Sequence, residues 1–87
     1  MTTKAPSPVR PATHQGLETI AYASVAGIPT VDPHDRDRLG YNIWVWLKYR
    51  RDPLEFAVRT SRARLLVSEE EAVRTIRDHL SQQGVAL

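Results

Sequence analysis

The fold depends on residues 41–59, YNIWVWLKYRRDPLEFAVR, in which an alternating apolar pattern precedes a proline-containing turn signal. One parity of the first half holds aromatic and aliphatic residues: Tyr41, Ile43, Val45, Leu47 and Tyr49. The other parity holds Asn42, Trp44, Trp46, Lys48 and Arg50. Strict alternation with β-branched and aromatic residues is typical of a strand that has one covered face. We therefore predict a strand over residues 41–50.

The residues that follow predict a hairpin. Asp52 and then Pro53 have the composition of a type I turn. Beyond this turn, alternation resumes at Leu54, Phe56 and Val58. The turn would set the register of the two strands, and the register decides which side chains share a face. The core face would then carry Tyr41, Ile43, Val45, Leu47, Tyr49, Phe56 and Val58. The outward face would carry Trp44, Trp46, Lys48, Arg50, Ala57 and Arg59.

A helical interpretation of the same stretch stays open. Its apolar stripe would consist of Leu39, Ile43, Trp46 and Leu47, with Arg50 in the next place. It would also put Gly40 inside a helix, where glycine is unfavourable. Asp52, Pro53 and Glu55 fit a helix start as N-cap, N1 and N3 residues. If that helix forms, residues 53–66 are helical and the fold is all-α.

The flanking segments predict helices. Residues 15–26 place apolar side chains on one face, and Gly27 and Pro29 follow as stop signals. Asp32, Pro33 and Asp35 resemble a helix start, which predicts a short helix around residues 33–39, with an ordered loop as the alternative.

The C-terminal part predicts one further helix and a short strand. Ser68 and Glu71 have the spacing of a capping box, which predicts a helix over residues 69–83 that Gly84 ends. The apolar run at residues 65–67 is a possible third strand. Together these elements predict an α+β fold: an N-terminal helix, a β-hairpin and a C-terminal helix.

Length and composition limit the domain organisation. The chain has 87 residues and no cysteine, so disulfides and thiolate metal sites are excluded. Residues 1–13 contain three prolines and few apolar groups, so we predict a flexible tail there and a single small domain over residues 14–87. No apolar run is long enough to span a bilayer, and we expect a cytoplasmic protein without a membrane partner.

The charge pattern indicates one surface for binding. The net charge is +2, yet residues 41–67 hold six basic residues against Asp52 and Glu55. Tryptophan, tyrosine and arginine are enriched at interface hot spots. We therefore predict a non-catalytic module that self-associates or binds a protein partner. The predicted partner-binding residues are Trp44, Trp46, Lys48, Arg50 and Arg59.

Two other interpretations of this patch stay open. The tryptophans could belong to the core, covered by the helix at residues 15–26. Alternatively, the patch could bind nucleic acid, since single strands stack on aromatic side chains flanked by cations. The additional nucleic-acid-binding residues would be Arg51, Arg62 and Arg64.

Catalysis, metals and cofactors are not expected. The three histidines are not paired at metal-ligand spacing. The acids at positions 32, 35 and 37, with His34 between them, lack the glycine of a calcium loop, and we interpret them as a solvated, salt-bridged turn. The sequence contains no nucleophile elbow, phosphate-binding loop or dinucleotide fingerprint.

Overall fold

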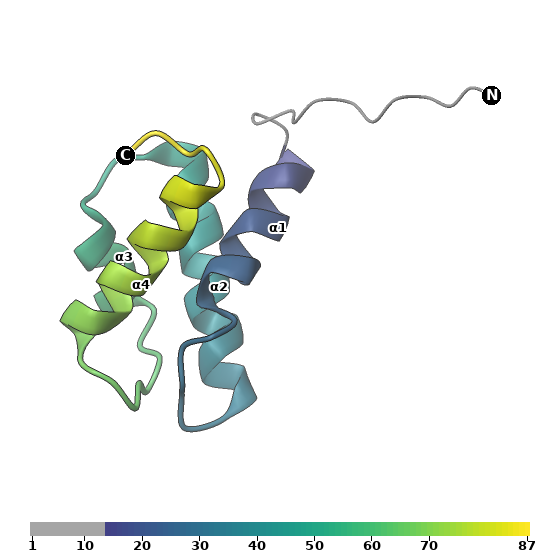
Figure 1. Ribbon diagram of the computed structural model, residues 1–87. Helices are drawn as coiled ribbons and strands as arrows, with labels where there is room; N and C mark the ends of the chain where they lie inside the picture. Colours follow the sequence, from purple (N-terminus) through teal and green to yellow (C-terminus); the bar gives the residue numbers. More distant parts are fainter. Residues whose placement is uncertain (1–13) are drawn as a thin grey trace.

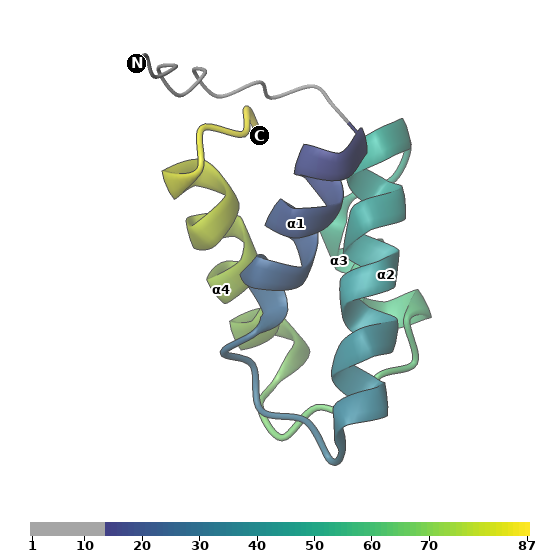
Figure 2. The same cartoon turned by 90° about the vertical axis from the view of Figure 1, so that its right-hand side faces the viewer.

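The computed structural model describes residues 14–87, which form α-helices joined by short loops (Figure 1). The helices are α1 (His14–Val25), α2 (Pro33–Tyr49), α3 (Leu54–Thr60) and α4 (Glu69–Gln82). Each helix packs against its neighbours along the chain. Helix α4 also packs against α1, so the four described helices form a closed ring (Figure 2). The predicted tail at residues 1–13 lies outside the described residues.

The predicted α+β fold is wrong, and the all-α alternative is the one observed. Residues 41–49 continue α2, and the second predicted strand is replaced by α3. The reason is the burial pattern: Leu39, Ile43 and Leu47, four residues apart, face the core. Tyr41 and Tyr49, which the strand interpretation placed on the same face as Ile43, are exposed. The apolar alternation therefore reflects two different sides of one helix.

The possible third strand is also absent from the described chain. Leu65 forms only an isolated antiparallel pairing with Thr30. Two backbone hydrogen bonds hold this pairing, from Val31 N to Arg64 O at 3.0 Å and from Leu66 N to Pro29 O at 2.9 Å. The pairing ties the loop before α2 to the loop after α3.

Close packing against α1 explains why a glycine lies inside α2 at position 40. Tyr22 of α1 packs directly on it, and a Cβ atom at position 40 would lie 2.4 Å from Tyr22 Cδ1. The missing side chain therefore lets the two helices approach closely. The partial burial of this tyrosine, followed by the carboxylates of Glu18 and Asp37, raises the pKa of Tyr22.

The start of α2 was predicted correctly, and its length was not. Asp32 Oδ1 accepts hydrogen bonds from His34 N at 2.8 Å and Asp35 N at 3.2 Å, while Asp35 Oδ2 accepts one from Asp32 N at 3.2 Å. This reciprocal cap starts a helix that runs to Tyr49 rather than to residue 39. It ends at Arg50, whose φ of 50° is left-handed and whose N–H bonds Trp46 O at 2.7 Å.

The other helix boundaries lie close to the predicted ones. Helices predicted at residues 15–26 and 69–83 are confirmed as α1 and α4, and Ser68 Oγ caps α4 by accepting from Glu71 N at 3.0 Å. Gly84 follows α4 with a φ of 85°. Pro53, not Asp52, occupies the N-cap of α3, and no side chain caps that end.

Candidate functional site

The helix separates the two tryptophans that a strand would have placed side by side. On α2 the four-residue spacing pairs each ring with a cation: Lys48 Nζ lies 4.2 Å from the Trp44 ring centroid, and Arg50 Cζ lies 4.7 Å from that of Trp46. Residues four apart share a helix face, whereas residues two apart do not. The predicted patch therefore divides into two cation–π pairs on different sides of α2.

The Trp44 pair has mainly a packing role. Its ring is half-buried against the core and meets Tyr41 edge to face, with 5.8 Å between centroids. Its Nε1 is buried without a hydrogen-bond partner among the described residues. This agrees with the core interpretation of that tryptophan.

The Trp46–Arg50 pair lies at the connection between α2 and α3 and stabilises it. Trp46 packs against the core, and its Nε1 donates a hydrogen bond to the backbone oxygen of Asp52. Arg50 covers the ring and also donates to Ala86 O at 2.8 Å. The remaining predicted residue, Arg59, lies on α3 and pairs with Glu69 of α4 at 2.8 Å. The five predicted residues therefore do not form one surface.

The three additional arginines are also dispersed. Arg64 binds Asp32 and Asp35 at the start of α2. Arg51 follows the other end of α2, roughly 20 Å away at the helical rise of about 1.5 Å per residue. Arg62 lies in the loop after α3 with a left-handed φ of 60°. These arginines do not make a continuous basic track.

A groove between α2 and α3 holds exposed aromatic residues that the sequence analysis placed in a core. It encloses about 450 Å³. Its lining residues are Asn42, Val45, Trp46, Tyr49, Arg51, Asp52, Phe56, Ala57 and Thr60. Tyr49 is 60% exposed and Phe56 is 46% exposed. The helical spacing of Asn42, Val45 and Tyr49, at i, i+3 and i+7, was the available signal for this row.

The polar side of the groove is fixed by Asn42. Its Nδ2 donates to Ala57 O at 3.0 Å and to Thr60 Oγ1 at 3.2 Å, and that hydroxyl donates to Phe56 O at 2.8 Å. Both amide hydrogens are used. The amide oxygen Oδ1 makes no hydrogen bond with any residue from 14 to 87, so it remains an acceptor at the groove.

The cations near this groove contact rings instead of carboxylates. Lys48 Nζ and Arg51 Cζ lie 5.4 Å and 5.8 Å from the Tyr49 centroid. Within the described part of the chain, neither of them nor Arg50 forms an ion pair. This end of α2 therefore presents positive charge without an ion pair beside exposed aromatic surface.

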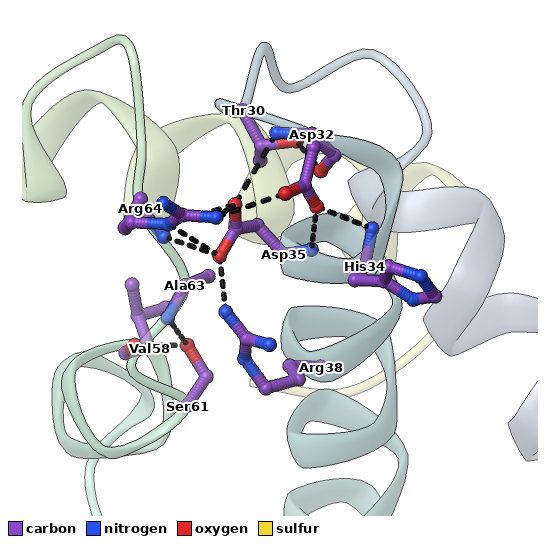
Figure 3. Close-up of polar contacts among 9 residues, drawn as sticks. All are labelled: Thr30, Asp32, His34, Asp35, Arg38, Val58, Ser61, Ala63 and Arg64. Atoms are coloured by element: carbon purple, nitrogen blue, oxygen red, sulfur yellow. Dashed lines mark hydrogen bonds and ion pairs between the residues drawn. The ribbon is translucent and has the colours of Figure 1, made fainter.

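Asp35 is the most heavily hydrogen-bonded acid of the described chain (Figure 3). Its side chain is buried, not solvated as the sequence analysis expected. Arg64 donates from its backbone N at 3.1 Å and from Nε at 3.1 and 3.2 Å, and Arg38 donates to Oδ1. The hydrogen bonds from Arg64 hold the pKa of Asp35 below its ordinary value.

This cluster is structural. Both carboxylate oxygens of Asp35 already accept several hydrogen bonds, so they have no free acceptor for a substrate or a metal. A lowered pKa also makes the group a poor proton donor at neutral pH. Asp32 shares Arg64 at 2.9 Å, and Thr30 Oγ1 donates to Asp32 O at 2.8 Å. The network joins the loop before α2 to the loop after α3.

Further comparisons add no site. Between residues 14 and 87, no three histidine or carboxylate side chains gather as a metal site would require. None of the four described helices has the length and apolar character needed to cross a membrane. No family model, curated protein or solved structure matches the chain.

Proposed function

We propose that the protein is a non-catalytic interaction module that binds a protein partner through the groove between α2 and α3. The observation that carries this proposal is the exposure of Tyr49 and Phe56 on either side of a groove that Trp46 also lines. Exposed aromatic side chains that line a concavity are the common form of a binding surface. The rest of the apolar core is covered by the four-helix ring.

The polar groups of the module favour binding over catalysis. The buried carboxylate of Asp35 is saturated by Arg38 and Arg64. The other acids in ion pairs, such as Glu55 with Arg77 and Glu69 with Arg59, lie on the surface. Catalytic sites need converging groups with access to a substrate.

Nucleic-acid binding and self-association are the competing functions. The cations beside Tyr49 support the first, because bases stack on such rings. The dispersed positions of Arg62 and Arg64 oppose it. Light scattering tests self-association, and a salt titration with a mixed-sequence oligonucleotide tests nucleic-acid binding, because phosphate contacts weaken steeply with salt.

Site-specific photo-crosslinking tests the proposal. A benzophenone amino acid replaces Val45 in the groove, and the control replaces Ser81, which is exposed on α4. We expect a discrete protein adduct from position 45 and none from position 81. The adduct should disappear in the Tyr49→Ser/Phe56→Ser variant. Equal adducts at both positions, or an adduct that the double substitution leaves unchanged, would overturn the proposal.

A further inference from the structure

We propose that the groove between α2 and α3 takes an acidic amphipathic peptide segment of the partner. The apolar side chains of this segment cover Tyr49 and Phe56. Its carboxylates pair with Arg51, which lines the groove, and with Lys48, whose Nζ lies 5.4 Å from the Tyr49 ring. This inference rests on the proposed function and adds the chemistry of the partner.

Charge complementarity is the main argument. Lys48, Arg50 and Arg51 follow one another closely at the end of α2. Among residues 14–87 they form no ion pair, and their charged groups lie 4.2 to 5.8 Å from the ring centroids of Trp44, Trp46 and Tyr49. A cation over a ring keeps its charge and its remaining N–H donors. These donors can bind carboxylates of a second molecule.

Three acids of the module are engaged away from the groove. Glu55 pairs with Arg77 at 3.5 Å and Glu69 pairs with Arg59 at 2.8 Å, both toward α4. Asp35 is buried at the far end of α2. Asp52 is the one carboxylate among the residues that line the groove, and it stands beside three cations. The basic end of the groove therefore favours a partner that supplies carboxylates.

A second copy of this chain fits the same groove poorly. The α2 residues along this side, at i, i+4, i+7 and i+11, are Arg38, Asn42, Val45 and Tyr49. A two-fold contact through this row would bring the cations at the end of α2 of each copy to a row that holds no carboxylate, while Arg38 within the row already pairs with Asp35. Like charges placed together at an interface oppose association. A foreign acidic segment avoids that cost.

The dimensions of the groove suit a short amphipathic segment. From Asn42 to Tyr49, α2 rises about 10 Å, which is two helical turns. Partner residues at i and i+3 or i+4 can then meet Val45 and Phe56, in the way helices bind in grooves. The free Oδ1 of Asn42 can accept an N–H at one end, and Arg51 lies at the other end for a carboxylate.

Selection from a random peptide library tests the inference on the full chain. The displayed peptides have about 16 residues, enough for roughly four helical turns. Peptides that bind the full chain but not its Tyr49→Ser/Phe56→Ser variant define groove ligands. We expect them to carry net negative charge and to repeat large apolar residues at intervals of three or four.

Two variants with the same net charge then distinguish ion pairing at the groove from a general effect of the net charge of the protein. Lys48→Gln/Arg51→Gln removes the two cations beside the Tyr49 ring, and Arg62→Gln/Arg74→Gln removes the same charge from exposed positions elsewhere. A selected peptide should bind the first variant about tenfold more weakly, as the loss of two partly exposed ion pairs implies. It should bind the second variant as it binds the unaltered chain.

The failures of the two proposals are distinguishable. Groove-dependent peptides that are neutral or basic would overturn the acidic partner and leave the interaction module in place. A dimer that the Tyr49→Ser/Phe56→Ser variant abolishes would show that a second copy occupies the groove, which also overturns the acidic segment. If no peptide and no dimer depends on Tyr49 and Phe56, the proposed function is overturned as well.

Discussion

Gly40→Ala gives the sharpest prediction about the helix packing. In an exposed helix interior this substitution stabilises a protein by about 1 kcal/mol, because alanine has the higher helix propensity. At position 40 the new Cβ would lie 2.4 Å from Tyr22 Cδ1 and 2.7 Å from Cε1. The ring cannot clear this contact by rotating a flexible tip, because its Cγ also lies within 3.2 Å. The substitution therefore forces α1 away from α2.

The expected magnitude follows from these two opposing effects. Overpacking a well-packed site costs about 1–3 kcal/mol, and the short contacts indicate the upper end of that range. After the gain in helix propensity, we expect a net loss of about 2 kcal/mol. For a domain of this size that loss lowers Tm by about 10 °C.

Thermal and urea denaturation followed by circular dichroism measure the effect. Gly27→Ala is the matched control, because nothing lies within 4 Å of a Cβ there and little change is expected. A second readout is the pKa of Tyr22, which burial raises above 10.0 and which should fall back when the ring is displaced. A higher Tm for Gly40→Ala would refute the close packing of α1 on α2.

Three further predictions address strain, the buried acid and the core. Arg62→Gly should stabilise the fold by about 1 kcal/mol, because a left-handed φ of 60° strains arginine and not glycine; a lower midpoint in urea would contradict this. Asp35→Asn should lower Tm at neutral pH, and the Tm of this variant should depend less on pH in the acidic range. The folded pKa of Asp35 is depressed, so its contribution is present above the unfolded pKa and is lost as pH falls through the folded pKa. A variant that loses stability on acidification as steeply as the unaltered protein would argue against this role. Ile76→Ala, at a fully buried site, should cost about 2–5 kcal/mol, whereas Tyr49→Ser should change the free energy of unfolding by less than about 0.5 kcal/mol. Equal costs at the two positions would show that Tyr49 belongs to the core.

The helix signals that are local in sequence were the predictable part of the fold. The start of α2 at Asp32, Pro33 and Asp35, and the cap of α4 at Ser68, depend on hydrogen bonds between near neighbours. Such caps can be recognised from residue type and spacing alone. They placed the starts of α2 and α4 at their observed positions.

The hairpin prediction failed because a long-range contact decides the structure of residues 40–49. Within the sequence, Gly40 opposed a helix and the alternation favoured a strand. The structure instead uses Gly40 as the contact point for Tyr22, which is 18 residues earlier in the chain. Tertiary packing overrides local propensity in this way. The segment does contain the helical stripe of Leu39, Ile43 and Leu47, but the contact with Tyr22 that suits Gly40 to a helix lies outside it.

The candidate site was predictable only in its chemistry. The aromatic and basic character of residues 41–51 was evident, and the spacing of Trp44 with Lys48 and of Trp46 with Arg50 already matched helical pairs. The groove itself was hidden, because it needs α3 to lie beside α2. Tyr49 and Phe56 were therefore assigned to a core that they do not enter.

The two tryptophan indole N–H signals provide the most direct test of the central claim, that a partner binds in the groove between α2 and α3. Trp46 lines this groove, whereas Trp44 lies on another side of α2 beside Tyr41. Because the chain has two tryptophans, two indole resonances report on both sides in one NMR titration with a selected peptide. We predict that the Trp46 resonance shifts and saturates, and that the Trp44 resonance, whose ring meets the ligand only through Lys48, shifts less. A shift of Trp44 alone, or no shift of Trp46 at saturation, would contradict the claim.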